Sequence, residues 1–339
     1  MLYISDFFTR HKEAVSNQLE LLAQHKSGKI IAATRFMGQK ALQKNECKAG
    51  IYIFPPLLYP IALAIVLMSS RSPVHTFEEE SFRWKRFFLN TSGRPLYVSL
   101  YRRPEAHHLP YLRTYKNLKK IFVELPIHKE YLVSQGFSSE LIEITPTPSK
   151  VVRKKSTKKF DQNNINIVFA SWNNSENNAL HDRGVIYLLD LLVKNPEYSL
   201  TIPLRDSKTA EFWEIAHAKG VTRRVKLLII NKPEDLEALF DESDFVSFVA
   251  QDRIAKDVPN SLIDGLSCGK PVIISDVLDF STVVEKQAIG YTIKSGTKPR
   301  RLKVTNKEYA AMSKRAYAYS KRHMPTIYQS TGTNYEEIK

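Results

Sequence analysis

Residues 256–274, KDVPNSLIDGLSCGKPVII, predict a loop, a short helix, a tight turn and a buried strand in that order. Polar and turn-forming residues at 257–261 precede apolar residues at helical spacing, Gly269 ends that pattern, and Pro271 opens an apolar run. The free N–H groups and positive dipole end of such a helix form a seat for an anion. Asp264 lies one turn into the helix, where a sugar carried on a phosphate would sit.

Strands and helices alternate on both sides of this stretch. The expected strands are 2–5, 29–33, 51–54, 72–77, 95–100, 120–124, 142–145, 165–170, 200–204, 225–230 and 245–249. The expected helices are one through 14–22 and those at 60–69, 81–90, 109–118, 128–135, 184–194, 210–219, 235–240 and 307–319. Because strand alternates with helix, we predict an α/β protein with mostly parallel sheets and helices on both sheet faces.

Length and composition predict two domains, since 339 residues suffice for two cores. Residues 151–164 have the Lys/Arg-rich and polar composition of a linker. We therefore expect one Rossmann-like domain over 1–150 and a second over 165–305, with a cleft between the carboxyl ends of their sheets. Residues 306–339 would form a C-terminal helix that packs back on the first domain.

Composition excludes several classes of protein. The two cysteines, Cys47 and Cys268, are too far apart in sequence for a metal-like spacing, which argues for a reducing compartment. The charged N-terminus lacks the core of a signal peptide, so we expect a cytoplasmic protein. The apolar run 51–70 is divided by three prolines, and we interpret it as a strand, a turn and a buried helix rather than a membrane span.

Charge is distributed unevenly along the chain. Residues 1–160 contain 26 Lys and Arg against 12 Asp and Glu, whereas residues 161–339 contain 24 against 23. The basic first half favours an anionic partner, namely a membrane surface, an anionic acceptor or, as a weaker alternative, nucleic acid. A basic surface that serves only solubility is the other interpretation. The oligomeric state is not predicted.

The segment PNSLIDGLSCGKPVIISD, residues 259–276, resembles the donor-site signature of the family-4 glycosyltransferases, which are retaining enzymes of the GT-B fold. Arg183-Gly184, which opens a helix after a strand, stands where that family has Lys-Gly, and 225–248 follows its strand and helix order. The resemblance covers 165–295 well and 70–148 loosely. It implies a GT-B fold of two Rossmann-like domains facing across a cleft.

The chain departs from the family pattern at informative positions. The paired glutamates of the family would fall at Lys256 and Asp264, so the first acid has become a cation with Asp257 beside it. The usual Gly-Gly is replaced by Leu278-Asp279. These changes suggest altered substrates or weakened catalysis.

Transfer from a nucleotide sugar requires neutralisation of the leaving diphosphate and a rigidly held donor. No two aspartates lie two residues apart, so the Asp-x-Asp pair that holds a metal in many transferases is absent, and we expect neither metal nor cofactor. Cations and helix N-termini would meet the diphosphate instead. The expected donor-binding residues are Arg183, Arg205, Asn231, Asn260, Ser261, Leu262 and Asp264, with Asp264 accepting from ribose hydroxyls.

Candidates for catalysis are His75 at the end of a strand, Glu79 in the acidic cluster after it, and Lys256 in place of the family acid. The acceptor candidates Arg102, Arg103 and Trp84 come from the basic first domain. Trp84 lies in SFRWKRFFL, residues 81–89, which reads either as a helix on a membrane surface or as an ordinary amphipathic helix.

The sequence therefore predicts a metal-independent glycosyltransferase that moves a sugar from a nucleotide-diphosphate sugar to an acceptor glycan or lipid-linked glycan. The setting would be cell-surface polysaccharide biosynthesis, with the protein peripheral on the inner face of the membrane. A DNA-modifying glycosyltransferase and a non-catalytic nucleotide-sugar or glycan-binding protein of the same fold remain alternatives.

Overall fold

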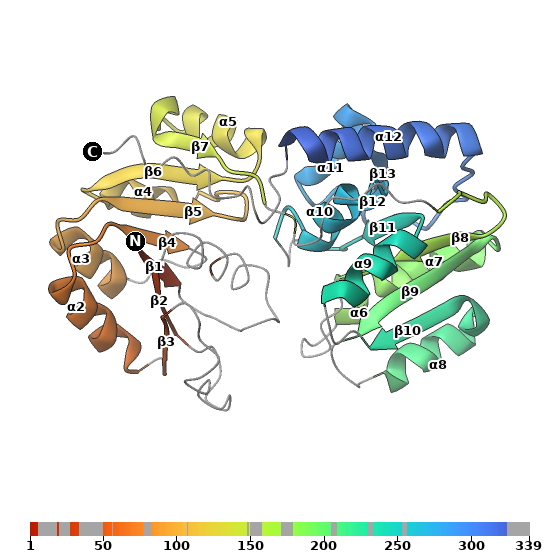
Figure 1. Ribbon diagram of the computed structural model, residues 1–339, viewed down its shortest axis with the longest axis horizontal. Coiled ribbons are helices and arrows are strands. Elements are labelled where there is room, and N and C mark those ends of the chain that lie inside the picture. The colour runs from red at the N-terminus through yellow and green to blue at the C-terminus, as the bar shows by residue number, and fades with distance from the viewer. Residues whose placement is uncertain are drawn as a thin grey trace. The chain divides into compact units, whose positions relative to one another are not determined.

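The computed structural model divides the chain into two compact units, residues 1–146 with 328–339 and residues 147–327. It describes residues 1–5, 19, 28–33, 50–55, 57–77, 83–106, 108–147, 149, 158–170, 179–204, 209–229, 233–252 and 256–323. Each unit is an α/β body around one parallel sheet (Figure 1). The division at Pro146 and Thr147 lies near the boundary expected after residue 150.

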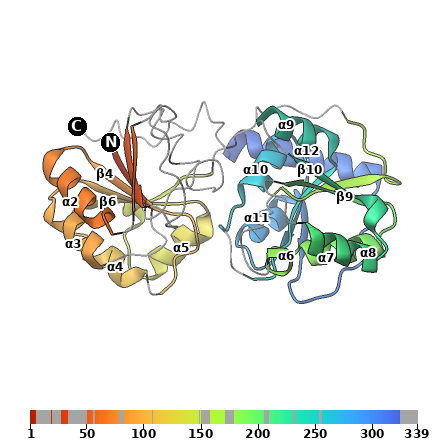
Figure 2. The same cartoon turned by 90° about the horizontal axis from the view of Figure 1, so that it is seen from below.

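The first unit contains a seven-stranded sheet in the order β3-β2-β1-β4-β5-β6-β7. Its strands are β1 Leu2–Ser5, β2 Lys29–Ala33, β3 Ile51–Phe54, β4 Val74–Phe77, β5 Leu96–Leu100, β6 Leu118–Val123 and β7 Ile142–Ile144. Its helices are α2 Tyr59–Ser69, α3 Arg83–Thr91, α4 Leu109–Thr114 and α5 Pro126–Ser134, with a 3-10 turn η2 at Ser139–Leu141. These four α-helices lie along one face of the sheet (Figure 2).

Alternation along the strands gives the first sheet two buried faces. Leu2, Ile4 and Val98 point toward the helices, where Leu63 and Leu132 complete a large apolar core. A smaller apolar cluster packs on the opposite face. Its buried members are Tyr3, Leu19, Ile30, Ala32, Phe77 and Tyr101. Burial on both faces explains why these strands read as continuous apolar runs.

The second unit contains a six-stranded sheet in the order β10-β9-β8-β11-β12-β13. Its strands are β8 Ile165–Val168, β9 Tyr198–Leu204, β10 Val225–Ile229, β11 Phe245–Phe248, β12 Val272–Ser275 and β13 Gly290–Ile293. Its helices are α6 Ala179–Asp182, α7 Val185–Lys194, α8 Ala210–Ala218, α9 Pro233–Glu242, α10 Asn260–Ser267, α11 Phe280–Gln287 and α12 Asn306–His323, with the 3-10 turn η3 at Thr222–Arg224. Helices α9, α10 and α12 lie on one face and α7 and α8 on the other (Figure 2).

Close packing fixes α10 against the centre of the second sheet. Every α10 residue from Ser261 to Ser267 is buried. At Gly265 a Cβ atom would come within 2.4 Å of Val246 in β11, so the absence of a side chain allows the helix to approach the strand. Residues 256–274 thus form a loop, a buried helix, a turn and a buried strand, in the predicted order.

Helix α12 packs on α10 within the second unit. The Ser313 hydroxyl donates to the Gly269 carbonyl at 2.7 Å, and Ser267 and Ser320 share a hydrogen bond of 3.0 Å. The Tyr309 hydroxyl donates to the Asp244 carbonyl at 3.0 Å. The described part of the expected C-terminal helix therefore packs on the second unit. The prediction that residues 306–339 pack back on the first domain stays a prediction, because residues 324–339 lie outside the described residues.

Phe160, within the expected linker, stacks on Tyr309 of α12 with ring centroids 4.0 Å apart. One expectation about the first unit needs correction. The helix at 60–69 is present but has an exposed apolar side, with Ile61 59%, Ile65 55% and Met68 80% exposed. Among the helices that the structure describes, none combines the length and apolar character needed to cross a membrane.

Candidate functional site

The strand order of the second sheet reverses between β8 and β11. In open α/β sheets, ligands bind outside the carboxyl ends of the strands at such a reversal. The segments that leave this edge contain Arg183 before α7 and Lys256 to Asp264 at the start of α10. The topology therefore brings the two donor-binding segments of the sequence prediction to one edge of one sheet.

Gly184 holds these two segments together. It has a left-handed φ of +75° at the N-cap of α7. A Cβ atom there would lie 2.0 Å from the carbonyl oxygen of Val249, which follows β11. Next to this contact, the Gln251 N–H donates to the Asp182 carbonyl at 2.9 Å. Only glycine permits this approach of backbone to backbone, and Arg183 is fixed beside it, partly exposed.

Helix α10 begins after Pro259, which is its N-cap. The Leu262 N–H already donates to the Pro259 carbonyl at 3.0 Å, so its expected role as a donor to a diphosphate does not fit this geometry. The N–H groups of Asn260 and Ser261 precede that of Leu262 in the first turn of the helix, where backbone donors point toward the N-terminal end. Ser261 is 7% exposed.

Lys256 is buried at the start of this helix, with an exposed fraction of 8%. Its Nζ donates to the Thr147 hydroxyl at 2.7 Å and to the Asn260 side-chain oxygen at 3.3 Å. A buried cation at this place adds positive charge to the helix N-terminus. The position where the family has an acid thus carries a fixed positive charge within one turn of the helix N-terminus.

Asp264 is also buried, at 6% exposure. Its Oδ1 accepts a hydrogen bond of 3.0 Å from the Ser149 hydroxyl. Ser149 and Thr147 therefore hold Asp264 in α10 and Lys256 in the loop before it, although they precede these residues by 115 and 109 positions. Sequence reasoning missed both residues, because nothing local marks a serine and a threonine in PTPSK as partners of a helix so far along the chain.

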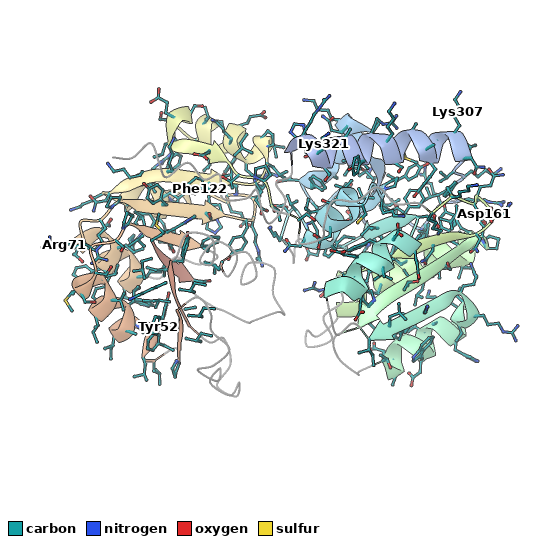
Figure 3. The ribbon with its side chains drawn as sticks, in the orientation of Figure 1. Tyr52, Arg71, Phe122, Asp161, Lys307 and Lys321 are labelled. Atoms are coloured by element: carbon teal, nitrogen blue, oxygen red, sulfur yellow. The ribbon has the colours of Figure 1, made fainter. Side chains whose placement is uncertain are left out.

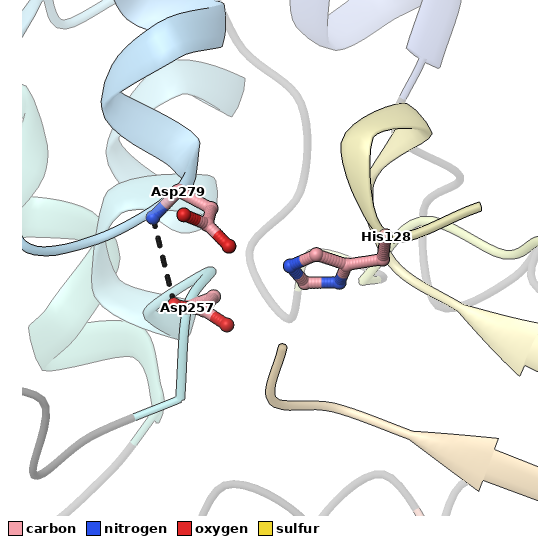
Figure 4. A group of neighbouring side chains, drawn as sticks. All are labelled: His128, Asp257 and Asp279. Carbon is pink, nitrogen blue, oxygen red and sulfur yellow. Dashed lines mark hydrogen bonds between the residues drawn. The ribbon is translucent and has the colours of Figure 1, made fainter. Parts of the chain in front are cut away.

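Asp257 and Asp279, which stand at two other positions where the chain departs from the family pattern, contact each other. Asp257 and Asp279 are buried at 3% and 7% exposure, and the Asp279 N–H donates to Asp257 Oδ1 at 3.5 Å (Figure 4). Asp279 is the N-cap of α11. The loop before α10 is thereby fastened to the start of α11, so the replacement of Gly-Gly by Leu278-Asp279 adds a contact to the neighbouring segment.

Burial governs the ionisation of the side chains behind α10. It raises the pKa of the Cys268 thiol to about 12, with the Asp264 carboxylate adding to the shift. Cys268 is therefore a protonated core side chain and no nucleophile. Burial lowers the pKa of Lys270 to about 8, and its Nζ donates to the carbonyls of Asp241 and Ser243 at 2.9 and 2.7 Å. Lys270 thus fastens the chain between α9 and β11.

His75 lies inside β4 instead of at its end, which corrects the expected position. It is 1% exposed, its ring centroid is 4.7 Å from that of Phe77 and 5.2 Å from that of Phe122, and Nε2 shares a hydrogen bond of 2.8 Å with Ser99. Burial lowers the pKa of His75 to about 3, so the ring is neutral. A neutral ring enclosed by aromatic side chains supports the sheet, and the geometry gives no support to a catalytic role.

The acceptor candidates are separate features of the first unit. Trp84 in α3 packs edge-on against Tyr59 with ring centroids 5.6 Å apart, and so joins the core. Arg102 is exposed after β5, and the Arg103 guanidinium lies 5.8 Å from the centroid of the Tyr131 ring. The remaining candidates Glu79, Arg205 and Asn231 lie outside the described residues.

The chain superposes over nearly its whole length on several solved structures. Anabaena HepE in complex with UDP matches with a TM-score of 0.75 at 15% identity, covering 99% of this chain and 98% of HepE. WaaG, a glycosyltransferase involved in lipopolysaccharide biosynthesis, matches with 0.63 at 11% identity, covering 95% of each chain. The fold is GT-B.

The GT-B fold is also that of sucrose-phosphate synthase from Thermosynechococcus elongatus, which matches with a TM-score of 0.64 at 11% identity over 96% of this chain and 95% of that enzyme. HepE has in addition been crystallised with UDP-glucose and with UDP and glucose. No family model matches the sequence. No curated protein matches it either. At these sequence identities the structural similarity establishes the GT-B fold, as the sequence predicted. The activity has to be inferred from the residues of the candidate site.

Proposed function

We propose that this chain is a glycosyltransferase that moves a sugar from a nucleotide-diphosphate sugar to an acceptor glycan or lipid-linked glycan. The observation that carries the proposal is the start of α10, where a helix N-terminus, the buried Lys256 and the buried Asp264 meet at the strand reversal of the second sheet. A phosphate-bearing ligand fits that combination, because two positive elements stand one helical turn from a carboxylate.

In the proposed donor complex, the diphosphate lies at the start of α10. The N–H groups of Asn260 and Ser261 and the ammonium of Lys256 meet its oxygens, and Arg183 adds a guanidinium from the start of α7. Asp264, held by Ser149, accepts from the ribose hydroxyls. Support comes from the GT-B fold and from HepE, which has been crystallised with UDP and UDP-glucose. Arg205 and Asn231 remain proposed donor-binding residues.

In the proposed reaction, an acceptor hydroxyl attacks the anomeric carbon, the bond to the diphosphate oxygen breaks, and the hydroxyl proton passes to a base. The positive groups of α10 stabilise the charge that grows on the leaving diphosphate. No metal takes part in this scheme, so a chelator leaves the rate unchanged. Retention of the anomeric configuration and membership of family 4 belong to the same proposal, supported by the resemblance of residues 259–276.

The basic first unit is proposed to hold the acceptor, with Arg102, Arg103 and Trp84 as the candidates. WaaG is involved in lipopolysaccharide biosynthesis, which supports an acceptor in cell-surface polysaccharide assembly. We place the protein in the cytoplasm, peripheral on the inner face of the membrane.

The experiment is a turnover assay of the full chain with a panel of nucleotide sugars, with and without chelator. Slow release of nucleoside diphosphate from one donor, reduced at least about tenfold in Asp264→Ala, is the expected result. Product anomers read by NMR then report retention or inversion. If no donor is hydrolysed or transferred and none binds, the proposal fails.

A second candidate function is a nucleotide-sugar-binding protein without turnover. It is favoured by one observation, the replacement of the family acid by Lys256, whose ammonium is buried and hydrogen-bonded to Thr147. Micromolar binding of a nucleotide sugar, with neither hydrolysis nor transfer to any acceptor offered, would select this candidate.

A further inference from the structure

Helix α2 of the first unit is apolar on every side. Its buried face consists of Tyr59, Leu63 and Leu67. Its opposite face, which we call the outer face, consists of Ile61, Ile65 and Met68 at exposures of 59, 55 and 80%, preceded by Leu57 and Leu58 at 76 and 53%. A surface helix of a water-facing protein carries polar residues on that side, and the sequence contains no charged residue from 51 to 70.

Arg71 supplies an exposed positive charge beside the outer face, two residues after the end of α2 (Figure 3). Of the seven Lys and Arg within 57–77 and 83–104, Lys85 and Arg94 are buried at 0 and 8% exposure, and Arg102 is exposed. The described residues of these two ranges contain no Asp or Glu; Glu78, Glu79 and Glu80 lie outside the described residues, and the exposed Glu105 follows the second range. Helix α3, which packs on α2, exposes 63% of Phe87.

We propose that the outer face of α2 docks on an anionic lipid bilayer, with Ile61, Ile65 and Met68 in the interfacial region and Arg71 at the headgroups. Apolar area buried in the interface and the attraction of cations to anionic lipid add up in such binding. A second copy of this chain fits less well, because a symmetric contact between two such faces would bring Arg71 and its neighbouring cations toward their own equivalents. This inference rests on the proposed peripheral placement and names the surface that makes it; it needs no turnover, so membrane docking and glycosyl transfer can fail separately.

The test is flotation of the full chain with vesicles of phosphatidylcholine alone or mixed with phosphatidylglycerol. Three chains are compared: the wild type, the triple variant Ile61→Gln, Ile65→Gln, Met68→Gln, and a control triple variant Val133→Gln, Val193→Gln, Ile229→Gln. The control removes three apolar side chains exposed by 40, 46 and 77% elsewhere on the surface. Glutamine is a good helix former, so the α2 variant should keep its helix.

We expect the wild type and the control to bind the anionic vesicles equally, and the α2 variant to bind at least about tenfold more weakly. Binding should fall between about 0.1 M and about 1 M salt. Equal binding by all three chains, or no binding by the wild type, would overturn the proposal. So would a wild-type dimer, measured by light scattering, that the α2 variant abolishes while neither chain binds vesicles.

A fluorescence measurement guards against misfolding of the variant. An environment-sensitive dye on Ile65→Cys in a Cys47→Ser background should shift to the blue with anionic vesicles, and the same dye on Val133→Cys should not. Cys268 is buried and stays unlabelled. Equal shifts at both positions would refute docking through α2.

Discussion

In both units the strand order reverses between the first strand and the fourth, but the two reversals contain different chemistry. In the first unit, Tyr3 and His75 face each other from β1 and β4 with ring centroids 5.7 Å apart, inside an aromatic cluster. In the second unit, the segments after β8 and β11 meet through glycine and backbone at Gly184 and Val249. The same topology therefore supports a neutral packed centre in one unit and a charged helix start in the other.

The surfaces of the two units differ in how charge is placed, since both units are basic: residues 1–146 with 328–339 contain 21 Lys and Arg against 14 Asp and Glu, and residues 147–327 contain 29 against 21. At the start of α10 the second unit holds single charges with hydroxyl groups, as Thr147 holds Lys256 and Ser149 holds Asp264. The first unit exposes apolar side chains on α2. A fixed charge suits a small ligand bound in one orientation, whereas a broad basic and apolar surface suits an extended anionic partner.

The largest effect is expected from Gly184→Ala. The added Cβ would meet the Val249 carbonyl at 2.0 Å in a left-handed conformation, and we expect unfolding to become easier by about 3 kcal/mol or more. Gly220→Ala is the matched control, since Gly220 has a φ of +68° with no atom within 4 Å, and it should cost about 1 kcal/mol. Urea unfolding compares them, and equal losses would mean that the contact between the two segments does not stabilise the unit.

The His75→Phe variant tests the neutral centre of the first unit. The unfolded ring titrates near pH 6.5 and the folded ring at about 3, so the unfolded state binds the extra proton between these values. The stability contributed by the neutral ring is fully present above pH 6.5 and is lost as the pH falls toward 3, by about 1.4 kcal/mol per pH unit.

At pH 5 the wild type should therefore have lost about 2 kcal/mol relative to His75→Phe, compared with their difference at pH 7.5. Denaturant unfolding at the two pH values measures this change. If the difference in the free energy of unfolding between wild type and His75→Phe does not change with pH, the ring of His75 is not buried in its neutral form.

The Lys256→Met variant tests the charge at the start of α10. Removing this buried cation should weaken binding of nucleoside diphosphates about tenfold, or about 1.4 kcal/mol, measured by calorimetry. Lys226→Met removes an exposed lysine from β10 of the same unit and should leave the affinity within about twofold. Affinity retained in Lys256→Met would show that the diphosphate is bound elsewhere.

The smallest effect is expected from Ser149→Ala, which removes the hydrogen bond to Asp264 Oδ1. We expect a loss of nucleoside diphosphate affinity of about threefold to fivefold, equivalent to about 1 kcal/mol. Ser149→Thr keeps the hydroxyl and should restore most of it. If Ser149→Thr behaves like Ser149→Ala, the hydroxyl does not position the carboxylate.

Periodicity predicted most of the fold because the central strands β1, β4, β11 and β12 are buried along their whole length and helices such as α7 and α10 bury an apolar stripe. The stretch 256–274 was informative because cap, helix, glycine and strand signals agree over a short range. The partners of Lys256 and Asp264 could not be predicted, since they lie more than 100 residues away. His75 was misplaced because a histidine near three glutamates looks the same in sequence whether its ring is exposed or enclosed. The exposure of the outer face of α2 could not be predicted, because a continuous apolar run in a sequence predicts a helix that is buried on all sides.

The central claim is that Asp264 contacts the ribose of a bound nucleoside diphosphate at the start of α10. The most direct measurement first finds the tightest binder among UDP, GDP, ADP and CDP, and then compares it with its 2′,3′-dideoxy form on the wild type and on Asp264→Ala. We predict that the wild type prefers the ribose form by about tenfold and that Asp264→Ala binds both forms equally. A preference that survives in Asp264→Ala, or no binding of any of the four, would contradict the account.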